Sequence, residues 1–287
     1  MTPAPPPLDL VVIGGLTVDR FADGSSSPGG TVMHAARATA ARGLGIGIVT
    51  AAGGEPEAQA GLAELRQIAR FVECRPRDRS ITFRHFVAAD GRTLWLERAG
   101  GSAEVGPELR RRLDTRAVLC APVLDEVPTA ALEAWGDAVV RGATLQGWLR
   151  SAEVGAEVRP LALSAVGAGV VDALAGFDLL VASREDLAAE GQVPFDQLAA
   201  LRRVFGTRPH LIVTDGADGL WHDAPLAASG SRHYPVPWRV ETISTVGAGD
   251  ILAAMLVTSF DHAQQRGEAW IAAAMRIVAE ILEALSS

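Results

Sequence analysis

Short apolar runs alternate with longer helix-like stretches along this chain, and this alternation constrains the fold more than any other feature. Each run is nearly free of polar residues, as a strand buried on both faces would be. The runs cover residues 8–13, 46–50, 117–120, 179–182 and 211–214. Alanine-rich stretches of helical character lie between several of them. Strands that alternate with helices form a parallel sheet covered on both faces, so the sequence predicts an α/β fold.

One region departs from this alternation. Residues 80–87 and 93–97 have the character of strands, and the turn between them contains Asp90-Gly91. Two such strands joined by Asp-Gly predict a β-hairpin. The hairpin can stand away from the main sheet as a lid that excludes water from a site, or it can form an antiparallel edge of the main sheet. The residues alone leave both readings open.

The length, the first residues and the lengths of the apolar runs restrict the class of protein. A chain of 287 residues, 48% of them hydrophobic, can bury one large core or two smaller ones. Residues 1–7 are rich in proline and lack the basic and apolar regions of a signal peptide, and we expect them to form a flexible arm. No apolar run reaches the length of a membrane-spanning helix. We therefore expect a soluble, cytoplasmic protein with no membrane partner.

Charge and composition exclude several functions. The formal net charge is -8, which argues against nucleic acid as a partner. All 26 basic residues are arginine, and the absence of lysine excludes both the Walker A phosphate-binding motif and a Schiff-base mechanism. The two cysteines, Cys74 and Cys120, show no spacing typical of a zinc cluster or a disulfide framework.

A glycine-rich turn at residues 244–250 is the strongest candidate for chemistry. It ends in Gly247-Ala248-Gly249-Asp250, directly before an apolar helix. Small residues at a helix start let backbone N–H groups converge on an anion, and the helix dipole favours the negative charge. Asp250 could accept a proton from a substrate hydroxyl while these N–H groups stabilise a transferring phosphoryl group. The alternative is an ordinary turn in which Asp250 only caps the helix.

This turn has companions elsewhere in the chain. Two glycines three residues apart, Gly216 and Gly219, follow the predicted strand at residues 211–214. Near the start of the chain, a diglycine, Gly29-Gly30, precedes an alanine-rich helix. These separations favour a binding site over an isolated structural turn.

The combination resembles the ribokinase-like, or PfkB, family of sugar kinases, from about Asp9 to the C-terminal helix. The first family signature matches Gly29-Gly30 and the residues through Gly43-Leu44-Gly45. The second matches Thr245 to Asp250. The resemblance implies a three-layer α/β/α fold, with a central mostly parallel sheet and a small β lid. It places one kinase domain at residues 8–287, with the lid formed by segments near 16–27 and 80–98.

The resemblance also implies roles for individual residues. The catalytic base would be Asp250, and the anion hole would be Gly247, Ala248 and Gly249. Substrate would be bound by Asp19, Gly29, Gly30 and His34. The nucleotide would be bound by Ser183, Thr214, Gly216, Gly219 and Thr245. Magnesium would be organised indirectly, through water, by Asp186.

Three positions depart from the family pattern. His34 replaces an asparagine that contacts the sugar, and an imidazole cannot offer both an amide donor and an amide acceptor. Ser244 replaces an acidic residue just before the anion hole. The family's Asn-x-x-Glu motif reads Ser183-Arg184-Glu185-Asp186, which keeps a carboxylate on a shorter side chain.

We therefore expect an ATP-dependent kinase that requires Mg²⁺ and phosphorylates a hydroxyl of a sugar, nucleoside or cyclitol. The alternative is a catalytically impaired relative that binds a metabolite or nucleotide for regulation. A dinucleotide-dependent oxidoreductase is disfavoured, because Gly14-Gly15 lacks the G-x-G-x-x-G pattern. Apolar side chains on the hairpin make a homodimer through the lid possible.

Overall fold

A large twisted sheet forms the centre of the protein. The computed structural model describes residues 7–88, 91–100, 113–136, 139–151, 153–225, 230–238, 246–260 and 269–286. The sheet has nine strands in the order β13-β12-β11-β10-β9-β8-β1-β4-β5. Their bounds are β1 Leu10–Ile13, β4 Ile46–Ala52, β5 Phe71–Pro76, β8 Ala117–Cys120, β9 Val140–Thr144, β10 Leu179–Ser183, β11 His210–Thr214, β12 Leu220–Asp223 and β13 Arg232–Tyr234. From β11 to β5 every pairing is parallel, and β12 and β13 add an antiparallel edge.

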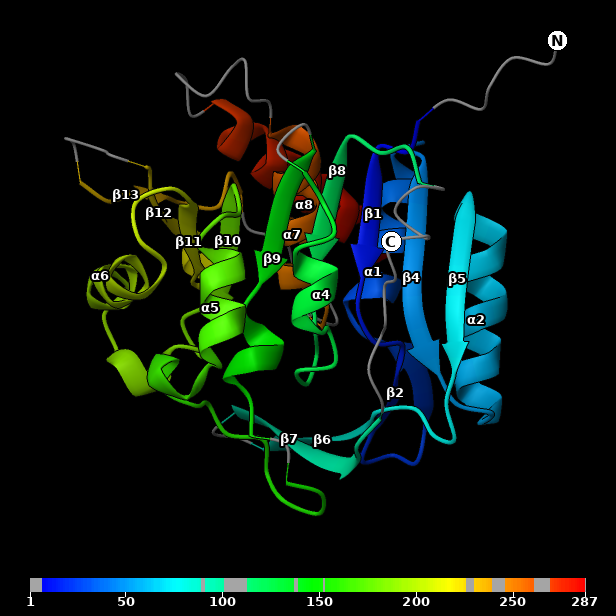
Figure 1. Ribbon diagram of the computed structural model, residues 1–287. Helices are drawn as coiled ribbons and strands as arrows, with labels where there is room; N and C mark the ends of the chain where they lie inside the picture. The colour runs from blue at the N-terminus through cyan, green and yellow to red at the C-terminus, as the bar shows by residue number, and fades with distance from the viewer. Residues whose placement is uncertain are drawn as a thin grey trace, which may run out of the picture.

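Helices cover both faces of this sheet (Figure 1). Leu10 and Val12 of β1 belong to the apolar cluster shared with the helices on one face, whereas Val11 and Ile13 belong to the cluster on the other. The first face carries α1 Thr31–Ala41, α2 Pro56–Ile68, α7 Ala248–Ser259 and α8 Ala269–Ser286. The second carries α4 Thr129–Leu132, α5 Ala168–Leu174 and α6 Pro194–Phe205. The predicted three-layer α/β fold is confirmed.

The five apolar runs all became strands of the central sheet, but other strands escaped notice. In β9, Arg141 and Gly142 interrupt the apolar pattern. The Arg141 guanidinium donates to the carbonyl of Gly176 at 2.6 Å, and Gly142 leaves room for Val257 of α7 to pack against the strand. Because this strand contains a paired charge and a glycine, it does not read as an apolar run, although it lies in the centre of the sheet.

A smaller, four-stranded sheet has the order β3-β2-β6-β7. Its strands are β2 Thr17–Arg20, β3 Ser26–Gly29, β6 Thr82–Ala88 and β7 Gly91–Arg98. The predicted hairpin is thus β6 and β7, and it pairs with β2 instead of extending the main sheet. Residues 89–90 of its turn lie outside the described residues. In Figure 1 the small sheet lies below the central one, at the end toward which the arrowheads of β4 and β5 point.

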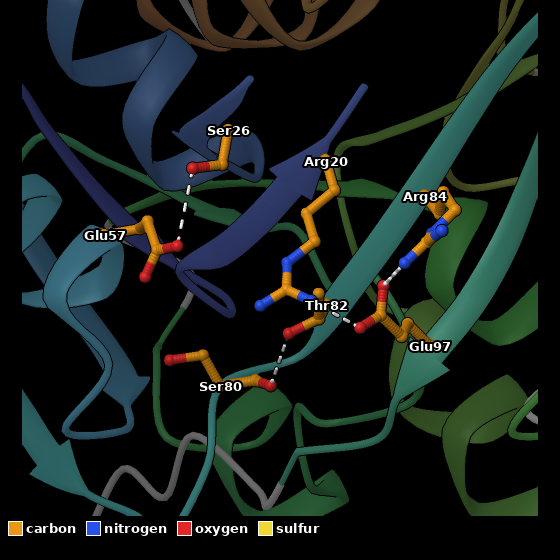
Figure 2. Close-up of polar contacts among 7 residues, drawn as sticks. All are labelled: Arg20, Ser26, Glu57, Ser80, Thr82, Arg84 and Glu97. Carbon is orange, nitrogen blue, oxygen red and sulfur yellow. Dashed lines mark hydrogen bonds and ion pairs between the residues drawn. The ribbon is translucent and has the colours of Figure 1, made fainter. Parts of the chain in front are cut away.

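The two faces of the small sheet differ in character. One face carries Arg20 and Arg84, which flank Glu97 and pair with its two carboxylate oxygens (Figure 2). These partly exposed ion pairs align β2, β6 and β7 but add little stability. Successive side chains of a strand point to opposite faces, so Asp19 and Phe83 face the other way. The apolar part of that face packs against Val123 and Leu124, which follow β8.

A buried carboxylate ties the small sheet to the main one. Glu126 accepts N–H hydrogen bonds from Gly15 at 2.7 Å, Val123 at 2.9 Å and Leu124 at 2.7 Å. Burial raises the pKa of the Glu126 carboxyl, and these backbone donors lower it in part. Gly15 lies between β1 and β2, so Glu126 holds the point where the chain leaves the central sheet for the small one.

A pair of buried histidines at the antiparallel edge predicts a pH-dependent stability. His210 Nδ1 and His222 Nε2 lie 2.8 Å apart, so one nitrogen donates and the other carries no proton. Burial lowers the pKa of His222 to about 4, and the positive charges of Arg202 and Arg232 add to the effect. The folded-state pKa lies below the unfolded value, so this stability is complete above about pH 6.5 and is lost as the pH falls toward 4.

We expect the His222→Gln variant to show a weaker loss of stability in acid than the unsubstituted protein. The loss attributable to His222 amounts to about 3 kcal/mol between pH 7 and pH 4, from the size of the pKa shift. Urea unfolding at several pH values measures it. An equal pH slope in both proteins would contradict the assignment.

Among the described residues, every helix is too short or too polar to cross a lipid bilayer.

Candidate functional site

The N-termini of α1 and α7 meet, although they are far apart in sequence. The hydroxyl of Thr31, the first residue of α1, donates a 2.6 Å hydrogen bond to Asp250 Oδ1. Asp250 lies in the first turn of α7. Thr31 is fully buried, whereas Asp250 is only half-buried. The two glycine-rich segments singled out in the sequence therefore converge on one carboxylate.

Gly247 precedes α7 in a left-handed conformation, with φ of 81°. A side chain here would overlap the imidazole ring of His34, which projects from α1 onto this glycine. Both the backbone conformation and the close approach of His34 therefore require glycine. The structure brings His34 next to the turn predicted to form the anion hole.

The first turn of α7 presents backbone N–H groups that no side chain in the described part of the chain caps. The first intrahelical hydrogen bond that closes the turn runs from Ile251 N–H to the carbonyl of Gly247. The earlier amides, including those of Ala248 and Gly249, have no partner of this type. Such a helix start, with its dipole, favours a bound anion. Ser244 and Thr245 lie outside the described residues.

Asp19 lies on the inner face of the small sheet and is 6% exposed. Its Oδ1 accepts a hydrogen bond from the Thr17 hydroxyl at 3.2 Å and lies 3.4 Å from Nε2 of His85. Its Oδ2 fills the space that a side chain on Gly29 would need. Asp19 and the diglycine, predicted to bind substrate together, are therefore in contact. Gly30 begins α1 with φ of 85°, close to the carbonyl of Gly15.

The residues expected to bind the nucleotide form a second group, on β10 and β11. Ser183 and Thr214 are register partners at the carboxyl ends of these strands, and Arg184 N–H donates to the Thr214 carbonyl at 2.9 Å. Gly216 and Gly219 follow in a tight turn, with φ of 54° and 103°. Carboxyl ends of neighbouring parallel strands share one edge, where α/β proteins bind their ligands.

A shallow depression of about 610 Å³ adjoins this turn. Its lining includes Asp215, Ala217 and the ring of Trp221, which contacts the ring of His233. Aromatic walls of this kind suit a planar base. A second cavity, of about 590 Å³, lies between the amino ends of β8 and β9 and the end of α7, and contains none of the predicted site residues.

Asp186 is the only residue expected to organise a metal. Its Oδ2 accepts hydrogen bonds from the hydroxyl of Ser183 at 2.7 Å and from the N–H of Ser183 at 3.2 Å. Its Oδ1 lies 3.9 Å from Nε of Arg150. One carboxylate oxygen is therefore engaged by Ser183, and the other faces the guanidinium of Arg150. Among the described residues, no cluster of three or more metal-binding side chains exists.

Sequence reasoning overlooked several residues of this region. Thr31 could have been found, because it directly follows the diglycine and opens the helix. His85 could also have been found, because strand alternation places it on the face of Phe83. Arg150 and Glu126 carry no local signal, since each acts on residues distant in sequence.

A family model described as pfkB family carbohydrate kinase matches residues 15–281. The chain belongs to this family. The resemblance drawn from the two glycine signatures is confirmed, and so is the expectation of a carbohydrate kinase. No curated protein matches the sequence.

Solved structures of similar fold cover nearly the whole of this pfkB-family chain. A pyrophosphate-dependent kinase of the ribokinase family, complexed with a pyrophosphate analogue and myo-inositol, has a TM-score of 0.70 and 17% identity, over 96% of this chain and 94% of its own. Adenosine kinase from Schistosoma mansoni has a TM-score of 0.70 and 13% identity, over 96% of each chain. A nucleoside kinase from Methanocaldococcus jannaschii has a TM-score of 0.65 and 12% identity, over 98% of this chain and 92% of its own. At such low sequence identities the likeness supports the shared fold only. The substrates named for those proteins are not assigned to this chain.

Proposed function

We propose that this pfkB-family protein transfers the terminal phosphoryl group of ATP to a hydroxyl of a small polyol, such as a sugar, nucleoside or cyclitol. The observation that carries the proposal is the convergence of Thr31 and Asp250 at the adjoining starts of two helices. A carboxylate that only capped α7 would need no partner from α1. Here a buried hydroxyl orients it beside backbone amides that no described side chain caps.

The acceptor hydroxyl would lie between Asp250 and the small sheet. Asp250 Oδ2 takes the proton of the attacking hydroxyl while Thr31 holds Oδ1. The N–H groups at the start of α7 stabilise the negative charge that spreads over the transferring phosphoryl group. Asp19 binds another hydroxyl of the acceptor beside Gly29. The small sheet serves as the lid that excludes water.

The donor would lie along the carboxyl ends of β10 and β11, with its phosphates near Ser183 and Thr214 and its base near the turn that contains Gly216 and Gly219. Mg²⁺ bound to the donor's own phosphate oxygens would neutralise part of their charge. A magnesium role for Asp186 stays a prediction. The lid-mediated homodimer likewise stays a prediction.

A phosphorylation screen tests the proposal. Purified protein is incubated with MgATP, and separately with magnesium pyrophosphate, because one structural neighbour is pyrophosphate-dependent. The acceptors are pentoses, hexoses, nucleosides and inositols, and ³¹P NMR detects the phosphomonoester. We expect turnover of at least one acceptor with ATP. Donor binding without turnover across the whole panel would instead indicate the regulatory alternative.

A Thr31→Val variant isolates the contact to the base. Valine keeps the buried volume but removes the hydrogen bond to Asp250, and a hydrogen bond to a charged group contributes about 1.5–3 kcal/mol. We expect kcat to fall about tenfold or more, with the KM for ATP little changed. Thr31→Ser keeps the hydroxyl and should retain most of the activity. Equal kcat in the valine and serine variants would show that the hydroxyl does not act on the base.

A further inference from the structure

Arg150 occupies a position that no sequence motif marks. It follows a 3₁₀ turn, Gln146–Leu149, beyond the carboxyl end of β9. Here the chain leaves the central sheet and returns to it, an excursion that spans residues 150–160. Two hydrogen bonds close its base: Ser151 N–H donates to Arg159 O at 2.9 Å, and Leu161 N–H donates to Leu149 O at 2.7 Å. Arg150 thus lies at the base of the excursion, on the same edge of the central sheet as Ser183 and Thr214.

The far end of this excursion is anchored to the small sheet. Leu96 N–H of β7 donates to the Ala156 carbonyl at 3.0 Å, and Gly155 N–H donates back to Leu96 at 2.7 Å. Val158 N–H donates to Leu94 at 2.7 Å. In Figure 1 this green segment descends from the central sheet and runs beside β7. Because both ends are held, the backbone on which Arg150 stands is fixed.

The guanidinium of Arg150 is mostly buried but loosely paired. Its side chain is 19% exposed, and its Nε lies 3.9 Å from Asp186 Oδ1, which is too long for a hydrogen bond. No other described residue accepts a hydrogen bond from this guanidinium. Asp186 itself is held by Ser183. A positive charge with several free donors is therefore oriented toward the carboxyl ends of β9 and β10.

We propose that Arg150 binds the phosphate chain of the phosphoryl donor, with Asp186 as the residue that positions it. The proposal rests on the proposed kinase function. A planar guanidinium offers paired N–H donors that match phosphate oxygens, and it keeps its charge at any physiological pH. The chain has no lysine, so among its side chains only arginine offers a positive charge that does not depend on pH near neutrality. The ligand chemistry is a diphosphate unit, carried by a nucleoside triphosphate or by inorganic pyrophosphate.

Calorimetric titration of the full chain with ATP, and separately with sodium pyrophosphate, each with and without MgCl₂, tests the assignment. We expect Arg150→Gln to weaken binding of the donor by at least about tenfold, and to raise its KM more than it lowers kcat. Arg150→Lys keeps the positive charge but lacks the planar guanidinium, so we expect its affinity for the donor to be intermediate. It also provides a second test if the glutamine variant folds poorly. Arg42→Gln is the matched control, because Arg42, directly after α1, pairs with Glu280 of α8 at 3.0 Å and lies outside the site.

The outcomes separate this inference from the function itself. Weakened binding of ATP or pyrophosphate in the Arg150 variants supports the inference, and the affected ligand identifies the donor. Unchanged binding of both in Arg150→Gln and Arg150→Lys overturns the inference but not the kinase assignment. Wild-type protein that binds neither donor overturns both. An Asp186→Asn variant that needs about tenfold more Mg²⁺ for half-maximal activity would assign Asp186 to the metal and overturn its positioning role.

Discussion

Replacement of Asp250 by asparagine should lower kcat by a factor of about 10²–10⁴, the usual contribution of a positioned general base. Asparagine has nearly the same shape and can still accept the hydrogen bond from Thr31. Its amide cannot take a proton from the acceptor hydroxyl. The geometry at the start of α7 should therefore survive while the proton transfer is lost.

Three measurements together make this prediction specific. Steady-state kinetics with the best acceptor of the screen gives kcat, calorimetry gives the affinity for ATP, and thermal unfolding reports the fold. We expect a large change in the first and little change in the other two. A kcat within threefold of wild type would show that Asp250 is not the base, whatever else the site does.

The Gly247→Ala variant should lose both stability and activity. A left-handed conformation costs a non-glycine residue about 1–3 kcal/mol, and the new methyl group would also overlap the ring of His34. Displacement of the turn moves the amides that precede Ile251 away from the phosphoryl group. The loss of a single anion-hole donor typically lowers kcat by about 10²–10³.

A control glycine separates backbone strain from the overlap with His34. Gly43 also has a positive φ, of 70°, but no atom lies within 4 Å of the position of an added side chain. Gly43→Ala should therefore lose stability from backbone strain alone and keep its turnover. The double variant His34→Ala, Gly247→Ala should recover part of the stability lost by Gly247→Ala, because the overlap is removed. If the stability losses of the two single variants simply add in the double variant, His34 does not clash with a side chain at position 247.

Much of the architecture was readable from local patterns. Buried parallel strands are continuous apolar runs, so strands such as β1 and β10 were visible without any tertiary information. β9 was not visible, because Arg141 is satisfied by partners that only the folded chain supplies. The hairpin was visible, but its place in a separate sheet was decided by its pairing with β2, which is far away in sequence.

The features of the candidate site also fall into two groups, those visible in the sequence and those found only in the folded chain. Local patterns in the sequence were enough to find the glycine-rich turn, its Asp250 and the family, because glycines with special backbone conformations and an acidic residue at a helix start are local requirements. The folded chain was needed to show that Thr31 holds Asp250, that His34 lies on Gly247 and that Arg150 faces Asp186. These contacts join segments that meet only at the shared edge of a parallel sheet. Their energies depend on distances between side chains, and no local pattern encodes those distances.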